Sequence, residues 1–330
     1  MENEYYFAWW NVENLFDINN SPNRPDWLQK RLKRELEGWN ASQLNTKIKQ
    51  LARVIAAMND DKGPDLLGCC EVESLGVVEK LVSKLNLTHR DYRIVHDDTD
   101  DRRGIDVAFI YDKNKFDIEI DPSTGKERVF SHIIQKRSAT RDIVQANFTT
   151  KSNSNFIVIG NHWPARLGGE MDSEPYRMMA GETLSYFLER ILEIRGEIPT
   201  FVMGDFNDEP FNRSLTNYAL STSSISKVVS KRARNPYLYN FMWTVMDGHH
   251  GTCSYGGVWG MLDQLLTNRA GLHESGIYCK PEDIRIFTIP GMVKGDKVIR
   301  HYRPSKGREY NPQGFSDHLP VILKVREKLG

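Results

Sequence analysis

Gly204-Asp205-Phe206-Asn207 and Ser316-Asp317-His318 are the two stretches that say most about the architecture of this chain. The first follows the apolar run 201–203, and the second shortly precedes the apolar run 321–323. Short apolar runs bounded by polar residues are typical of buried strands. Each stretch therefore places carboxylate, amide or imidazole groups beside a strand end, where α/β enzymes carry their chemistry. The pattern predicts an enzyme of the α/β class.

Two more strand ends near the amino terminus carry one oxygen ligand each. The aromatic run 5–10 stops at Asn11, and the run 65–70 stops at Glu71. Three later oxygen-bearing side chains complete the set: Asp205, Asn207 and Asp317. Carboxylate and amide oxygens without a thiolate suit a hard cation such as Mg²⁺, Mn²⁺ or Ca²⁺ rather than structural Zn²⁺. The residues therefore predict metal-assisted hydrolysis.

Six segments occur in an order that resembles the motifs of the endonuclease/exonuclease/phosphatase superfamily, the DNase I-like proteins. The segments are 10–15, 64–71, 161–164, 204–207, 262–265 and 316–318. They extend over almost the whole chain. No single segment is specific, but the ordered set points strongly to the superfamily and only weakly to a substrate. The resemblance implies a divalent-metal-dependent phosphoesterase.

The resemblance also implies roles for the oxygen-bearing residues. Glu71 would be the principal metal ligand, with Asn11 and Asp317 contributing directly or through water. Asp205 would orient or deprotonate the attacking water, and Asn207 would bind a phosphoryl oxygen or the metal. Taken singly, each of these residues could be a solvated side chain or a turn residue at a strand end.

Two histidines are expected to act on the phosphate. His318 would donate a hydrogen bond to it, and Asp263 would hold and charge the imidazole. By resemblance to the DNase I-like branch, His162 would lie on the other side of the scissile phosphate, with Asp106 as its candidate carboxylate partner. The alternative for each histidine is a structural residue.

Other charged residues divide into candidates and ordinary surface groups. Arg103 and Arg166 are candidate substrate-binding residues, because planar cations can clamp a phosphate; surface arginines are the alternative. Glu13 and Glu73 are expected to be surface or loop carboxylates, with a supporting role behind the site residues as the alternative. Asp208 is expected to be a turn residue. The segments 211–250 and 295–314 are either substrate-facing or solvated loops. The second contains five Lys and Arg residues: Lys297, Arg300, Arg303, Lys306 and Arg308.

Helical and strand-like patterns alternate, but several strands follow one another directly. Helices are predicted at 42–58, with Ser42 as a candidate cap, at 75–85 and at 175–195. Strands are predicted at 92–96, 106–111, 142–149, 155–160 and 199–205. Mixed sheets with outer helices fit this order better than a doubly wound parallel sheet. The resemblance implies a four-layer α/β sandwich of two packed, mixed and mostly antiparallel sheets flanked by helices.

The 330 residues, 39% of them hydrophobic, can form a large core. Because the motifs are scattered from one end to the other and must converge, we expect a single domain over residues 1–330. The four cysteines show no Cys-x-x-Cys spacing. Cys69 and Cys70 are expected to be buried small hydrophobes.

The formal charge is zero, with 44 basic and 44 acidic residues. This balance argues against a strongly basic face that grips nucleic acid, although local basic patches are compatible with it. No run of about 18 or more apolar residues and no export signal is present, so we expect a soluble protein. Two compartments are compatible with the sequence. The protein is either cytoplasmic, or exported by a signal that is absent from this sequence.

The sequence therefore predicts a divalent-metal-dependent phosphodiester hydrolase, and within that class a nuclease acting on DNA or RNA. The nuclease prediction rests on His162 and on the aromatic and basic loops. A phospholipid or small-molecule phosphodiesterase, or a phosphatase, is the alternative within the superfamily. A non-catalytic scaffold is a third hypothesis, and no protein partner is evident from the sequence.

Overall fold

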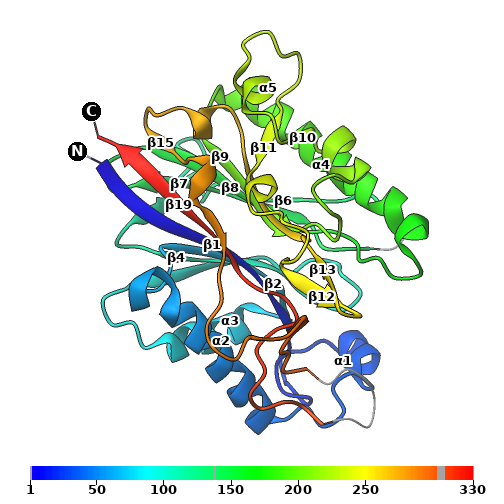
Figure 1. Ribbon diagram of the computed structural model, residues 1–330. Helices are drawn as coiled ribbons and strands as arrows, with labels where there is room; N and C mark the ends of the chain where they lie inside the picture. Colours follow the sequence, from blue (N-terminus) through cyan, green and yellow to red (C-terminus); the bar gives the residue numbers. More distant parts are fainter. Residues whose placement is uncertain (1, 137–138, 303–308, 330) are drawn as a thin grey trace.

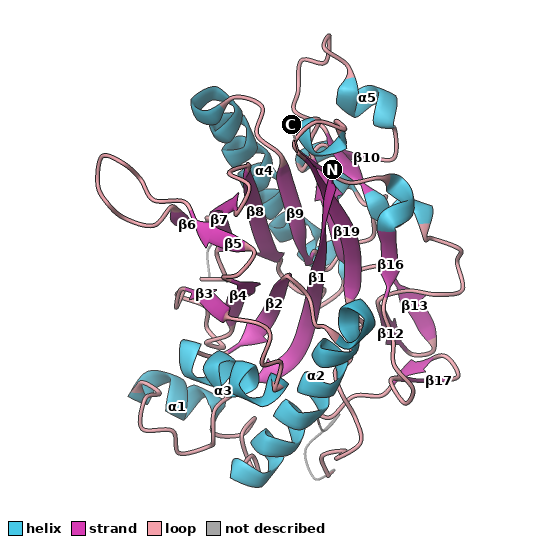
Figure 2. Cartoon of the chain, turned by 90° about the vertical axis from the view of Figure 1, so that its left-hand side faces the viewer, coloured by secondary structure: helices cyan, strands magenta, loops and turns pink. Residues whose placement is uncertain are grey.

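The computed structural model describes residues 2–136, 139–302 and 309–329. Two sheets pack face to face, and helices cover their outer faces (Figures 1 and 2). The helices are α1 (Asp26–Leu32), α2 (Ala41–Asp61), α3 (Leu75–Leu85), α4 (Glu170–Arg195) and α5 (Ile225–Val229). In Figure 2, α2 and α3 lie outside one sheet and α4 lies outside the other. The expected four-layer α/β sandwich is confirmed.

The first sheet joins both ends of the chain. Its strands are β1 (Glu2–Leu15), β2 (Leu66–Val72), β3 (Tyr92–His96), β4 (Asp106–Asp112), β15 (Ile277–Tyr278), β16 (Ile284–Ile286) and β19 (Val321–Lys328). They follow the order β15-β19-β1-β2-β4-β3, and β16 also pairs with β19. The β1–β2 pair is parallel, and the other described pairs of this sheet are antiparallel.

The second sheet comes from the middle of the chain. Its strands are β5 (Phe116–Ile118), β6 (Val129–His132), β7 (Ile143–Thr150), β8 (Asn155–His162), β9 (Thr200–Asp205), β10 (Ser221–Thr222), β11 (Leu238–Asn240) and β14 (Asp263–Thr267). They follow the order β10-β11-β14-β9-β8-β7-β5, with β6 also on β7. The β8–β9 and β10–β11 pairs are parallel.

Short elements connect the larger ones. Two hairpins stand apart from the sheets: β12 (Cys253–Tyr255) with β13 (Val258–Gly260), and β17 (Val293–Lys294) with β18 (Lys297–Val298). Single helical turns occur at Ser214–Tyr218, Phe241–Thr244, Ala270–Leu272 and Pro281–Asp283. No helix in the described part of the chain is both long and apolar enough to cross a membrane.

Strand alternation divides the apolar side chains between three cores. Along β4, Val107, Phe109 and Tyr111 belong to the core between the sheets. Ala108 and Ile110 belong to the core under α2 and α3. A third core packs α4 against the second sheet. Because successive strand residues face opposite sides, each buried strand supplies two layers at once.

The helix predicted at 42–58 begins one residue earlier and has a different cap. Asn40 Oδ1 accepts hydrogen bonds from the backbone nitrogens of Ser42 (2.9 Å) and Gln43 (3.1 Å). Ser42 is therefore inside the first turn, and the expectation that it caps the helix is wrong. The helix predicted at 75–85 is confirmed as α3, and α4 begins at Glu170 rather than near 175.

Candidate active site

Strand register brings the predicted residues to one end of the sandwich. In the first sheet, Asn11 pairs with Cys70, next to Glu71. Strand β19 is antiparallel to β1 and begins at Val321, which pairs with Trp9. The segment 316–318, which precedes β19, therefore lies near Asn11 at the same end of the sheet. In the second sheet, Asp205 pairs with His162 on one side and with Asp263 on the other. Residues far apart in sequence therefore meet because their strands end together.

His318 and Asp263 form the closest pair of the site. His318 Nδ1 lies 2.6 Å from Asp263 Oδ2, and Trp9 Nε1 donates to Asp263 Oδ1 at 3.2 Å. Burial lowers the pKa of His318, but the Asp263 and Asp205 carboxylates outweigh burial and hold that pKa well above its usual value. The imidazole is therefore a cation, which can donate a hydrogen bond from Nε2.

Asp205 lies at the centre of the site. Its Oδ2 accepts a hydrogen bond from Asn11 Nδ2 at 2.9 Å and lies 3.9 Å from His318 Nε2. Its Oδ1 accepts from the backbone nitrogen of Asn207 at 3.0 Å. Burial raises the pKa of Asp205 to about 7, while the positive charge of His318 opposes the rise. Such a carboxylate can exchange a proton near neutral pH.

His162 faces two carboxylates. Its Nε2 lies 3.8 Å from Glu71 Oε1 and 3.8 Å from Asp205 Oδ2. Burial is the main cause of a pKa well below the usual histidine value, and the positive charges of Arg141 and Arg103 lower it further. His162 is therefore a neutral imidazole, unlike His318.

The structure does not show the expected contact between Asp106 and His162. Asp106 accepts a hydrogen bond from Thr99 Oγ1, and His162 Nδ1 has no partner among the described residues. Asp106 alternates with Val107, whose side chain belongs to the core between the sheets. Strand alternation therefore turns Asp106 toward the helix layer, away from His162.

The oxygen donors fit a hard cation. Glu71 has a positive φ of 66° at a β-bulge, where the register of β2 shifts, and bulges of this kind re-aim side chains beside active sites. Its Oε2 accepts from the backbone nitrogen of Asn14 at 2.8 Å. Its Oε1 has no hydrogen bond among the described residues and can serve as a ligand. Asp317 is partly exposed, 3.1 Å from Arg300.

Asn207 keeps its amide oxygen available. Its Nδ2 donates to the backbone oxygen of Trp163 at 3.0 Å, and its Oδ1 has no partner among the described residues. Trp163 is buried against Phe206, with ring centroids 4.8 Å apart. The carboxamide is thus held in place by the fold and presents an acceptor.

The two candidate arginines are placed differently. Arg103 Nη1 lies 3.9 Å from Glu71 Oε1, and Nη2 contacts Asn14 and Glu35, so this side chain borders the site. Arg166 instead donates from Nε to the backbone oxygen of Asn207 at 2.8 Å. Its Nη groups lie near three further side chains: Asp208, Glu170 and Asn212. Arg166 therefore supports the loop that carries Asn207.

Sequence reasoning missed a buried charge network behind Asp317. Glu13, expected at the surface, is fully buried, and Lys47 Nζ lies 3.2 Å from its Oε2. Arg300 pairs with both Glu13 and Asp317. Burial raises the pKa of Glu13 to about 7, against the lowering effect of the two cations. The positive φ of Glu13, 55°, indicates a special backbone position that the sequence alone did not signal.

Two other carboxylates are buried: Glu73, expected at the surface or in a loop, and Asp208, expected in a turn. Glu73 pairs with Arg24, and Asp208 lies 2.7 Å from Arg177 Nε. Both pairs connect segments distant in sequence, so no local pattern identifies them. Cys69 and Cys70 are buried as expected.

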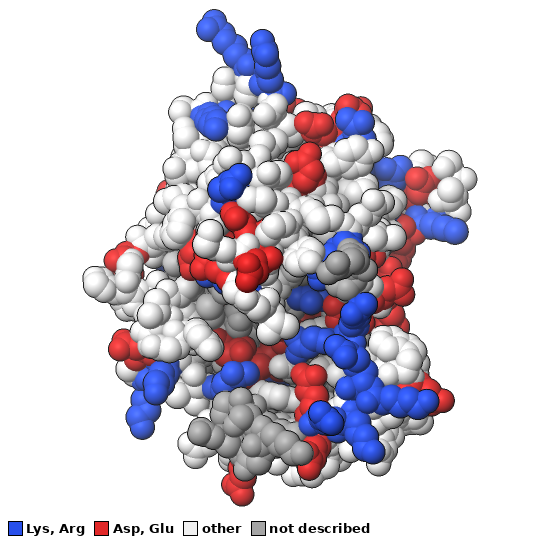
Figure 3. Space-filling model, turned by 90° about the vertical axis from the view of Figure 1, so that its right-hand side faces the viewer, with Lys and Arg blue, Asp and Glu red and all other residues white. Residues whose placement is uncertain are grey.

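The charge on one face of the molecule is mixed. Figure 3 shows the side of the molecule that faces right in Figure 1, where β12, β13 and α1 lie. Lys and Arg side chains gather in the lower right part of this view, with Asp and Glu side chains among them. Three basic residues of the predicted substrate-facing loop lie outside the described residues: Arg303, Lys306 and Arg308.

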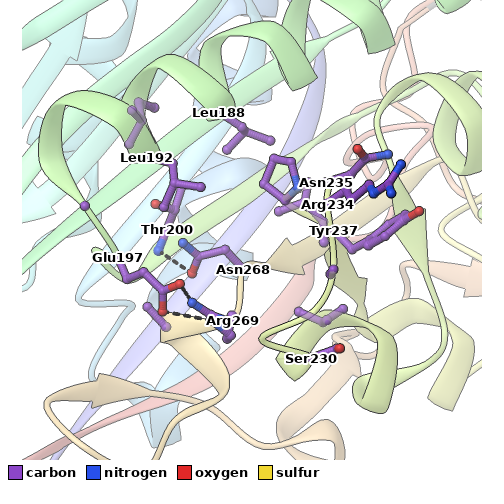
Figure 4. Close-up of a pocket in the computed structure, with 17 residues that line it drawn as sticks. Leu188, Leu192, Glu197, Thr200, Ser230, Arg234, Asn235, Tyr237, Asn268 and Arg269 are labelled. Atoms are coloured by element: carbon purple, nitrogen blue, oxygen red, sulfur yellow. Dashed lines mark hydrogen bonds and ion pairs between the residues drawn. The ribbon is translucent and has the colours of Figure 1, made fainter.

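A cavity of about 120 Å³ lies elsewhere, between α4 and the segment 228–238 (Figure 4). Leu188 and Leu192 line it on one side. Two pairs of its polar residues contact each other, since Arg269 contacts Glu197 and Thr200 N donates to Asn268 Oδ1 at 3.1 Å. None of the residues predicted for the site lines this cavity.

Comparisons with known proteins agree with this geometry. Residues 6–327 match the model of the "Endonuclease/Exonuclease/phosphatase family". Comparison with curated protein sequences gives no significant match. Three similar solved structures share the fold at low sequence identity.

The first is truncated TDP2 from Caenorhabditis elegans, with 13% identity, 98% of each chain covered and a TM-score of 0.56. The second is the human Nocturnin catalytic domain with bound sulfate, with 15% identity, 98% of this chain and 93% of that chain covered, and a TM-score of 0.57. The third is a mannosyl-6-phosphatase from Bacteroides thetaiotaomicron, with 17% identity, 97% and 99% covered, and a TM-score of 0.57. The chain belongs to the endonuclease/exonuclease/phosphatase family and is a metal-dependent phosphoesterase.

Proposed function

We propose that this protein hydrolyses phosphodiester bonds and that its substrate is nucleic acid. The observation that carries the proposal is the pairing of two unlike histidines around Asp205. His318 is charged by Asp263 at 2.6 Å, and the neutral His162 lies 3.8 Å from Asp205. A phosphodiester needs a donor for its developing charge and an acceptor for the proton of water, and this arrangement provides both.

Glu71, Asn11 and Asp317 are the proposed metal-binding residues. Mg²⁺ or Mn²⁺ bound by these oxygen donors would neutralise charge on the phosphoryl oxygens. Arg103 lies beside Glu71 and adds positive charge at the edge of the site. Glu71 Oε1 has no hydrogen bond within the described parts of the chain, which supports this assignment.

Asp205 is the proposed proton acceptor. Its Oδ1 is held by the backbone nitrogen of Asn207 and its Oδ2 by Asn11, so its orientation is fixed before substrate binds. His318 then donates a hydrogen bond from Nε2 to the phosphate, and Asp263 keeps the imidazole charged. His162 Nε2 and His318 Nε2 lie 3.8 Å and 3.9 Å from Asp205 Oδ2, and His162 is the second proposed contact of the phosphate. Asn207 presents its amide oxygen to the same region.

A small phosphodiester, a phospholipid or a phosphomonoester is the second candidate substrate class. The mixed charge of the face in Figure 3 favours it, because nonspecific nucleic-acid binding depends on neutralising many phosphates. The mannosyl-6-phosphatase among the similar structures is named for activity on a sugar phosphate. Arg166 donates a hydrogen bond to the backbone oxygen of Asn207, so fewer cationic side chains are available to bind the phosphates of a nucleic-acid strand.

Nicking of supercoiled plasmid in Mg²⁺ or Mn²⁺ tests the substrate class. We expect open-circular product that EDTA and His318→Ala both prevent, while His273→Ala, at an exposed histidine, nicks normally. No nicking by a protein that still hydrolyses bis(p-nitrophenyl) phosphate would contradict the nuclease proposal. The substrate search would then move to sphingomyelin, other small diesters and sugar phosphates.

A further inference from the structure

A second group of potential metal ligands lies outside the proposed active site. His96 ends β3, Asp106 begins β4, and Asp98 lies in the loop 97–105 that connects these two strands. One ligand atom from each of the three side chains lies within 4.8 Å of the others. His96 Nδ1 is 3.8 Å from Asp98 Oδ1. The group therefore has the size of a metal-binding site.

The buried imidazole of His96 points to a ligand. Its side chain is only 2% exposed, yet Nε2 has no hydrogen-bond partner among the described residues. A buried imidazole nitrogen without a partner costs free energy, because water that would have bonded to it is excluded. The other ring nitrogen, Nδ1, faces Asp98, and a cation bound through either nitrogen would give this buried imidazole a partner.

The negative charges of Asp98 and Asp106 also favour a bound cation. Asp106 is 1% exposed, and Thr99 Oγ1 is its side-chain hydrogen-bond donor. Within residues 2–136, 139–302 and 309–329, no lysine or arginine forms an ion pair with Asp98 or Asp106. A buried carboxylate is usually paired or bound to a metal. Here neither Lys nor Arg fills that role in the described structure.

We propose that His96, Asp98 and Asp106 bind a structural divalent transition-metal ion, Zn²⁺ or Mn²⁺. One imidazole and two carboxylates suit these ions, whereas Mg²⁺ and Ca²⁺ favour all-oxygen sites. The partly open side at Asp98, which is 78% exposed, leaves room for water as a further ligand. This site is separate from the proposed catalytic metal at Glu71 and does not depend on the proposed substrate.

Such an ion would connect the two ends of the loop 97–105. That loop holds Arg103 next to Glu71 and Asn14. Asp101, in the same loop, accepts from the backbone nitrogen of Arg103 at 2.8 Å and pairs with Arg141. Metal binding at the loop ends would therefore stabilise the position of Arg103 at the edge of the active site.

The test measures metal binding in the full chain carrying Glu71→Gln, which weakens the proposed catalytic site. After EDTA treatment and dialysis, calorimetry with Zn²⁺ and with Mn²⁺ is expected to show one ion per chain for at least one metal. Adding His96→Ala should abolish this binding, and adding Asp98→Asn should weaken it by about tenfold or more. His273→Ala is the matched control and should bind as the parent does.

Asp98→Asn separates loss of metal binding from loss of folding, because the side chain is mostly exposed and its replacement leaves the core intact. The melting temperature should rise with the bound metal in the Glu71→Gln protein and rise less in Asp98→Asn. The proposal is overturned if the Glu71→Gln protein binds neither metal. It is also overturned if Asp98→Asn binds both metals as tightly as its parent does.

Discussion

Asp263 and Asp205 are two buried carboxylates that act on the same imidazole in different ways. Asp263 Oδ2 lies 2.6 Å from His318 Nδ1, and its Oδ1 accepts a hydrogen bond from Trp9 Nε1. The backbone nitrogen of Asp263 donates to Thr252 Oγ1. Asp205 is 3.9 Å from Nε2, too far for a hydrogen bond. Asp263 therefore positions and charges His318, and Nε2 has no hydrogen-bond partner among the described residues.

Asp263→Asn should lower kcat by roughly 10²- to 10⁴-fold while the protein stays folded, because the amide can still accept from Trp9 but no longer stabilises the imidazolium. The His318 pKa should fall, so residual activity should be lost at a lower pH than in the wild type as pH rises. Kinetics on bis(p-nitrophenyl) phosphate across pH would measure both effects.

A matched control exists on the surface. Asp247 lies 2.6 Å from His250 Nδ1, the same distance as in the site, but both side chains are exposed. Asp247→Asn should leave kcat unchanged. A wild-type rate in Asp263→Asn, or an equal loss in both variants, would show that the buried pair has no special role.

At the residue scale, the sequence predicted most of the side chains that meet, apart from the contact between Asp106 and His162, but not what holds them. Asn11, Glu71, Asp205 and His318 could be predicted because each follows or precedes an apolar strand-like run. Arg300 pairs with Glu13, which is 287 positions away in sequence, and no local pattern indicates such a contact. The phosphate contact of Arg166 stays a prediction, and the sequence did not indicate the hydrogen bond from this arginine to the backbone oxygen of Asn207.

At the element scale, the first turn of α2 depends on Asn40. Asn40→Ala should lower the free energy of unfolding by about 1 kcal/mol, since two backbone nitrogens lose their acceptor. Ser42→Ala, inside the same turn, should change it little. Urea unfolding of both variants measures the difference. If Ser42→Ala lowered the free energy of unfolding more than Asn40→Ala does, Ser42 would be the cap, as the sequence pattern predicted.

Elements with strong periodicity were predictable, and irregular ones were not. α3 has the predicted bounds because its apolar residues repeat at helical spacing. β1 extends from Glu2 to Leu15, well beyond the aromatic run 5–10. Its later part pairs with β2 across a register shift between Asn11 and Leu15. That bulge depends on the partner strand, so a single segment does not reveal it.

At the scale of the whole molecule, we propose that the chain forms a single domain, because both sheets contribute residues to one site. Close contact between the sheets supports this. A Cβ on Gly160 of β8 would lie 2.7 Å from Val107 Cγ1 and 2.8 Å from Phe109 Cζ of β4. Glycine at this position allows the two sheets to approach.

Gly160→Ala should therefore lower the free energy of unfolding by about 1–3 kcal/mol through overpacking between the sheets. Gly76→Ala in α3 is the control, since a Cβ there meets nothing closer than 3.9 Å and alanine favours helix. It should be neutral or stabilising by up to about 1 kcal/mol. Urea unfolding measures both variants. Equal effects would contradict the inferred contact between the sheets.

The proposed mechanism requires both a bound metal ion and His318. The most direct test is the initial rate of bis(p-nitrophenyl) phosphate hydrolysis by the wild type, with EDTA, after Mn²⁺ or Mg²⁺ is restored, and by His318→Ala. We expect hydrolysis that EDTA abolishes, that added metal restores, and that His318→Ala loses while remaining folded. Hydrolysis that persists in EDTA, or a wild-type rate in His318→Ala, would contradict it.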